Sequence, residues 1–309
     1  MARHDFEPTA FFNAIGTSAP ALKVADGDTI VTRTLDAWGV DALGAQRAGA
    51  PNPMTGPFFV EGAEKGDTLE MRIDRMTANR ETGWTFAPLA PNVVDPDAAQ
   101  RLPSRERSTW LLDRAKGLAT LKTPPPALKT FVAPFAPMIG CFGVAPALGQ
   151  AISTATSGPN GGNMDYRLFG PGTTAYFPVS VEGALLYLGD GHYAQGDGEI
   201  VGTGIETTFE VEFTLRVHKA RTIKWPRGET AQEIFAIGNA RPLDQALQHA
   251  TTEMLAWLQA DYGLDAMSAS HLMGQMARYD VANVFNPAYS VACRMAKRVL
   301  AELRSGSSL

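Results

Sequence analysis

Residues 206–218, ETTFEVEFTLRVH, decide the fold class. Apolar side chains occupy every second position from Phe209 to Val217, and charged or hydroxyl side chains occupy the positions between them. This period of two is typical of a strand with one face on a core and the other in water. Strands of this kind belong to antiparallel sheets, so the run predicts a mainly β protein.

Two earlier segments repeat a shorter signal. Residues 25–36 (ADGDTIVTRTLD) and 64–76 (EKGDTLEMRIDRM) share Gly-Asp-Thr followed by an apolar residue, which predicts a turn leading into a strand. Residues 77–137 are rich in proline and have no sustained period. We expect them to form long excursions over the sheet surface, of the kind that build a site or a subunit contact.

The character of the chain changes after Pro242. Apolar residues recur at helical spacing from Leu243 to Leu258, and again in residues 292–303 (ACRMAKRVLAEL). Strands followed by helices favour an α+β fold whose helices lie on one side. We therefore predict a β-rich body over residues 1–240 and a helical C-terminal part over residues 241–309.

Composition narrows the class of protein. The chain has 309 residues, 45% of them hydrophobic and 19% charged, as in ordinary globular proteins. A net charge of −5 without a basic block argues against nucleic acid or an anionic membrane as partner. The N-terminal residues lack the features of a secretory signal, and Cys141 and Cys293 do not form a CxxC pair. These features predict a cytoplasmic protein without a membrane span.

The segment from 157 to 206 is the candidate site, because it is rich in glycine and in residues that could bind a metal or transfer a proton. Dense glycine indicates left-handed backbone or close approach to a ligand. Carboxylates and an imidazole could bind a divalent metal or form an acid/base set. The residues concerned are Asn163, Asp165, Asp190, His192, Asp197, Glu199 and Glu206.

Asp190 and His192 are the most specific candidate for a metal-binding pair in that segment. At a spacing of two on an extended chain they would project from one side and could bind one ion. A solvated hairpin turn is the alternative, since Asp-Gly pairs are common hairpin signals. A second Asp-Gly pair at Asp197 and the nearby GGNMD segment favour the functional interpretation. The glycine spacing does not match GxGxxG, and the acidic side chains would repel phosphate.

Other nucleophiles are less favoured. Ser153 and Ser157 have no lysine or histidine at a recognised companion position. Cys141 lies among Ile139, Phe142 and Val144, the surroundings of a buried and inert thiol.

Several longer motifs occur in a fixed order: LDAWG (35–39), NPMTGPFFVEGAEKGDTL (52–69), PMIGCFGVAPA (137–147), GGNMD (161–165) and the glycine-rich run 178–206. With these motifs the chain resembles the acetamidase/formamidase family. The resemblance implies hydrolysis of a short carboxylic amide to acid and ammonia. It also implies one domain over residues 1–309 with an antiparallel β-sandwich-like core, a divalent metal, and a homo-oligomer, dimer or higher.

On this basis we assign expected metal ligands. They are Asp36, Asp190 and His192, with Asp165 as a further ligand or as the group that orients the attacking water. Zinc is expected rather than calcium, because calcium rarely recruits imidazole.

The expected catalytic and substrate-binding groups complete the assignment. Glu199 is the expected general acid/base. Asn163 and the backbone N–H groups of Gly161 and Gly162 are expected to donate to the substrate carbonyl or oxyanion. Two alternatives stay open: a cyclic amide (lactam) hydrolase with the same site, and a non-catalytic binding module stiffened by calcium.

Overall fold

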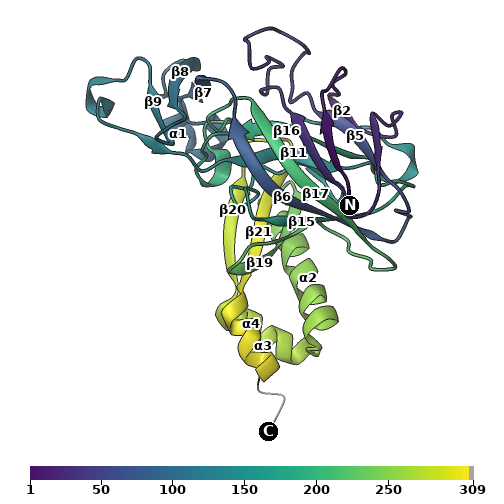
Figure 1. Ribbon diagram of the computed structural model, residues 1–309. Helices are drawn as coiled ribbons and strands as arrows, with labels where there is room; N and C mark the ends of the chain where they lie inside the picture. Colours follow the sequence, from purple (N-terminus) through teal and green to yellow (C-terminus); the bar gives the residue numbers. More distant parts are fainter. Residues whose placement is uncertain (306–309) are drawn as a thin grey trace.

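The computed structural model describes residues 1–305 and consists mainly of β-strands, with most of its helix at one end (Figure 1). Its largest sheet has nine strands, antiparallel except for the β1–β4 pair. In spatial order they are β1 (Arg3–Phe6), β4 (Thr29–Arg33), β17 (Phe209–His218), β6 (Thr68–Ala78), β15 (Thr174–Pro178), β18 (Arg227–Glu229), β19 (Glu233–Ala240), β21 (Tyr289–Ala296) and β20 (Arg278–Asn283).

The strand predicted from its period is central to that sheet. β17 pairs with β4 on one side and with β6 on the other. Its apolar residues Phe209, Val211, Phe213 and Leu215 are fully buried, whereas the residues between them are partly exposed. The two Gly-Asp-Thr turns lead into β4 and β6, as expected.

A second sheet of six strands faces the first. Its order is β13 (Ser157–Gly158), β14 (Gly161–Asn163), β11 (Met138–Val144), β16 (Leu186–His192), β5 (Thr55–Val60) and β3 (Leu22–Val24). Aromatic rings meet between the two sheets: Phe58 of β5 lies 5.5 Å from Phe213, and Phe142 of β11 lies 5.2 Å from Phe177 of β15. The shared apolar core confirms the mainly β, sandwich-like architecture.

Residues 77–137 are more ordered than predicted. They contain a four-stranded antiparallel sheet of β7 (Thr82–Ala87), β8 (Glu106–Asp113), β9 (Leu118–Leu121) and β10 (Ala133–Pro134), with the short helix α1 (Pro96–Ala99). The strands escaped prediction because only Trp110 and Leu112 in β8 give an alternating buried pattern. β2 (Ala14–Ile15) and β12 (Ile152–Ser153) form a separate ribbon, and 3₁₀ turns occur at Pro91–Val93, Pro126–Leu128, Ala147–Gly149 and Asp197–Glu199.

The C-terminal part combines helices with strands. The helices are α2 (Leu243–Tyr262), α3 (Ala266–Met276) and α4 (Lys297–Ser305), and α2 packs on β19 and β21. The predicted helix over 292–303 is wrong for residues 292–296, which belong to β21 and pair with β19. Pairing across the sheet overrides the helical propensity of this segment. None of the helices in residues 1–305 is both long and apolar enough to cross a bilayer.

A buried ion pair anchors the helical part. Arg227 Nε of β18 lies 2.6 Å from Glu253 Oε1 of α2, and both side chains are almost completely buried. Glu253 Oε2 also accepts the backbone N–H groups of Lys224 and Trp225. All the carboxylate's neighbours are therefore hydrogen-bond donors, which compensates for its removal from water.

Candidate functional site

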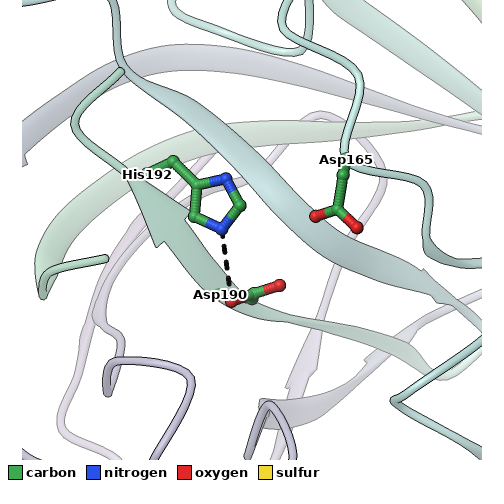
Figure 2. A group of neighbouring side chains, drawn as sticks. All are labelled: Asp165, Asp190 and His192. Carbon is green, nitrogen blue, oxygen red and sulfur yellow. Dashed lines mark ion pairs between the residues drawn. The ribbon is translucent and has the colours of Figure 1, made fainter. Parts of the chain in front are cut away.

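The candidate site lies where β16 ends. Asp190 and His192 project together from this strand, and His192 Nε2 is 3.5 Å from Asp190 Oδ1 (Figure 2). Asp165 comes from the loop after β14, and its carboxylate turns toward the same pair. All three side chains are buried. The structure thus brings together three of the residues that the sequence singles out.

Glu206 completes the cluster from a third segment. Its Oε1 lies 3.0 Å from His192 Nε2. The backbone of Glu206 bridges to His192 on one side and to Trp84 of β7 on the other, which fixes the position of the carboxylate. Glu206 is among the candidate residues of segment 157–206, but the sequence analysis assigned it no role.

Two asparagines that sequence reasoning missed hold the outer side of the cluster. Asn283 Nδ2 donates to Asp165 Oδ2 at 2.9 Å and to Glu199 Oε2 at 2.5 Å. Asn286 Nδ2 donates to Asp165 Oδ2 at 2.7 Å. Amide donors stabilise the ionised form of a carboxylate and fix its orientation. Each carboxylate is thereby held at one oxygen.

Apart from the ion pairs of His192 with Asp190 and Glu206, the inward atoms of the cluster have no hydrogen-bond partners. Asp165 Oδ1, Asp190 Oδ1, His192 Nε2 and Glu206 Oε2 are buried and form no hydrogen bonds. Ligand atoms of Asp165, Asp190 and His192 lie within 4.8 Å of one another, as do those of His192, Glu199 and Glu206. An unsatisfied buried acceptor is costly, and several acceptors that converge are satisfied together by one cation. The residues therefore fit a divalent metal.

The tautomer of His192 supports the same conclusion. Its Nδ1 lies 2.8 Å from Gln195 Oε1, and Gln195 Nε2 donates to the Asp165 carbonyl at 2.6 Å. With the amide oriented in this way, Oε1 must accept, so Nδ1 carries the proton. Nε2 is then the ring nitrogen that points into the cluster, and on losing its proton it could bind a metal.

Burial and mutual repulsion shift the ionisation of the cluster. Burial, helped by the charge of Asp190, raises the pKa of Asp165 to about 7. Burial likewise raises the pKa of Glu206 to about 8 and holds the pKa of Glu199 well above its ordinary value. For His192, burial opposes protonation, but the charges of Glu206 and Asp190 outweigh it and raise the pKa. A bound cation would supply further positive charge and would stabilise the ionised carboxylates.

Three of the carboxylates stand on left-handed backbone. The φ angles are 45° at Asp165, 57° at Asp190 and 47° at Glu199. Such angles are unfavourable for residues with a Cβ and persist only where the surrounding structure enforces them. Opposite these residues, Gly140 of β11 leaves just enough space: a Cβ there would lie 2.5 Å from Asp165 Oδ1 and 2.8 Å from the Asp190 carbonyl oxygen.

A cavity of about 250 Å³ opens above the cluster. Asn163, Asp190, Glu199 and Glu206 line its floor. The predicted substrate donors Gly161 and Gly162 do not line it. They pair with β11 inside the sheet at φ angles of 90° and 104°, and added Cβ atoms would strike the Phe142 and Thr156 carbonyl oxygens. Their lack of a side chain serves close strand packing, and only Asn163 of the three lies at the cavity.

Asp36 is placed apart from the other expected ligands. Its Oδ1 accepts the backbone N–H groups of Trp38 and Val40, and its Oδ2 accepts from Arg80 Nη1 and Trp84 Nε1, both at 3.1 Å. Both oxygens are hydrogen-bonded, and Asp36 belongs to neither group of neighbouring ligand atoms. The expected ligand role of Asp36 is therefore corrected: this carboxylate organises the turn after β4 and holds the indole of Trp84.

The comparisons with known proteins identify the family. A model of the "Acetamidase/Formamidase family" matches residues 103–253, the stretch that includes Asp165 and the other acidic residues of the site. The solved acetamidase of Bacillus halodurans is 30% identical, with a TM-score of 0.84 over 97% of this chain and 99% of that one. The chain belongs to the acetamidase/formamidase family. A "predicted acetamidase/formamidase" of Thermoanaerobacter tengcongensis, 28% identical, superposes with a TM-score of 0.85 over 98% of both chains.

A further member of the acetamidase/formamidase family matches part of the chain. The acetamidase of Mycolicibacterium smegmatis is 33% identical over 172 residues, which are 53% of this chain and 39% of that protein. The matched stretch thus spans less than half the length of that relative.

Proposed function

We propose that this protein hydrolyses short-chain carboxylic amides to carboxylate and ammonia with the help of a divalent metal. One observation supports this most directly: inward atoms of Asp165, Asp190, His192 and Glu206 are buried without hydrogen-bond partners, and Asp190 and Glu206 line a cavity large enough for a small amide. Membership of the acetamidase/formamidase family supports the substrate class. The proposed ligands are Asp165, Asp190, His192 and Glu206.

Zinc suits this set better than calcium. The set contains an imidazole nitrogen aimed inward, and calcium sites use oxygen donors. A bound divalent cation would supply Lewis acidity toward the amide carbonyl and activation of water. The protein's own residues must then orient the amide and move the proton.

Glu199 is the proposed proton carrier. It lines the cavity, and its raised pKa allows it to hold a proton near neutral pH. Asn283 fixes one of its oxygens, so the other can take a proton from water and return it to the departing nitrogen. Asn163 lies on the same floor, where its side chain can orient the amide.

The test is the Glu199→Gln variant, with the exposed Glu182→Gln as matched control. The amide keeps the shape of Glu199 but cannot exchange a proton. We expect kcat for acetamide and formamide to fall by about 10²–10⁴, with metal content unchanged. A folded, metal-loaded and fully active Glu199→Gln protein would end the case for Glu199. Absence of ammonia release by the metal-loaded wild-type protein from any small amide would refute the proposed function.

The cytoplasmic location and the homo-oligomer stay part of this proposal. The first rests on the two cysteines, which share no CxxC spacing, and the second on the family resemblance. Light scattering coupled to gel filtration tests the oligomer, and a monomeric mass at micromolar concentration would contradict it.

A further inference from the structure

The cavity is larger than the smallest amides require. A water-sized group occupies about 30 Å³, so the 250 Å³ cavity holds about eight such groups. Formamide has three non-hydrogen atoms and acetamide has four. Either would fill half of the space or less, and poorly filled sites bind and orient weakly.

The surplus space is lined by aromatic and proline side chains. Six of the lining residues are of this kind: Trp38, Trp84, Phe86, Phe285, Pro51 and Pro287. Trp38 is 40% exposed and Phe285 is 37% exposed, although both are large apolar residues. Apolar rings gathered around a concave surface mark a binding site for an apolar group.

These walls are held rigidly in place. The ring centroids of Trp38 and Trp84 are 4.9 Å apart, and Phe86 lies 5.5 Å from each of them. Asp36 holds the indole of Trp84 and the backbone of Trp38, because it accepts the Trp84 Nε1–H and the backbone N–H of Trp38. A cavity wall fixed before binding loses little conformational freedom when a ligand enters.

Two arginine side chains stack on the same rings, and one of them, Arg105, itself lines the cavity. The Arg105 guanidinium lies 4.1 Å from the Phe86 ring and 5.1 Å from the Phe285 ring. Arg107 lies 5.0 Å from the Trp38 ring. Stacked guanidinium groups hold ring planes in position. Trp84 and Phe86 belong to β7, within the small sheet at the upper left of Figure 1, so the sheet contributes directly to the cavity.

We propose that these rings form an acyl-binding subsite for amides whose acyl group carries an apolar ring, such as phenylacetamide. The inference rests on the proposed amide hydrolysis. The amide group would lie on the floor beside Asn163 and Glu199, and the ring would contact Trp38, Trp84 and Phe285. The subsite selects for size and apolarity of the acyl group.

The experiment compares kcat/KM of the metal-loaded full chain for acetamide, phenylacetamide and succinamate, the last carrying a carboxylate in place of the ring. We expect phenylacetamide to exceed acetamide by about 10–100-fold. The Trp38→Ala variant should lower this ratio by about tenfold, and Trp38→Phe should restore most of it. Phe131→Ala removes an exposed aromatic side chain that does not line the cavity, and it should leave the ratio unchanged.

The outcomes separate the inference from the proposed function. Hydrolysis of acetamide with no gain for phenylacetamide, or a preference for succinamate, would overturn the subsite and leave amide hydrolysis standing. If no amide is hydrolysed, the proposed function fails, and binding decides the subsite through tryptophan fluorescence. Phenylacetamide binding at least tenfold tighter than acetamide, and weakened by Trp38→Ala, would support it. Equal or undetectable binding would overturn it.

Discussion

Gly140→Ala should empty the proposed metal site while leaving every ligand residue in the sequence. A Cβ at this position would lie 2.5 Å from Asp165 Oδ1 and 2.9 Å from Asp190 Oδ2. Ordinary contact begins near 3.4 Å, so the Asp165 oxygen must move by about 0.9 Å. Ligand distances at metal sites tolerate about 0.2 Å. We expect metal affinity to fall by at least 10–100-fold, and activity with it.

The assay measures metal content after dialysis, the Kd for zinc by competition with a chelator, and kcat for acetamide. Crowding the sheet should also cost about 1–3 kcal/mol of unfolding free energy, which denaturant titration reports separately from metal loss. Gly196→Ala is the matched control, because its Cβ would meet nothing within 4 Å although it lies four residues from His192. A folded Gly140→Ala protein with wild-type zinc affinity and activity would refute the placement of the metal between Asp165 and Asp190.

Three further outcomes are expected. Metal binding should strengthen as the pH rises through 7 to 8 and should release protons. The reason is that the pKa values of Asp165 (about 7) and Glu206 (about 8) keep both carboxyls largely protonated at lower pH. A metal Kd that calorimetry finds independent of pH would contradict this. Glu253→Ala should lower the free energy of unfolding by about 3–5 kcal/mol, since Arg227 would stay buried without its carboxylate, and an unchanged thermal midpoint would argue otherwise. Thiol alkylation under native conditions should cost little activity, because Cys141 is fully buried and burial raises the pKa of its thiol; rapid inactivation through Cys141 would point to a thiol nucleophile instead.

The fold class could be predicted because its signals are local. The alternation in β17 and the turns before β4 and β6 depend on neighbouring residues alone. The C-terminal strand β21 could not be recognised, since Ala292 to Ala296 have helical propensity and become a strand only by pairing with β19. The small sheet β7–β10 was missed for another reason, because its strands are largely half exposed and give little alternation.

Part of the site could likewise be predicted from the sequence. Asp190 and His192 are two residues apart on one strand, and the strand geometry brings them together. Asn283 and Asn286 lie more than a hundred residues from Asp165, in a segment whose asparagines and proline resemble a turn, so nothing local reveals their contact with it. For Asp36 the sequence suggested a metal-ligand role, whereas its carboxylate accepts the hydrogen bonds of a turn. An aspartate followed two and four residues later by the N–H groups that it accepts is a turn signal, and that signal was available.

The left-handed backbone at Asp165, Asp190 and Glu199 has a consequence for evolution and engineering. Glycine at any of these positions would relax the backbone and remove a buried acid, so the metal-free protein should gain stability as it loses its chemistry. Selection for thermal stability alone would therefore replace these three residues early. Their retention under such selection would require a simultaneous demand for catalysis, and a thermostable descendant of this chain should be judged by turnover before melting temperature.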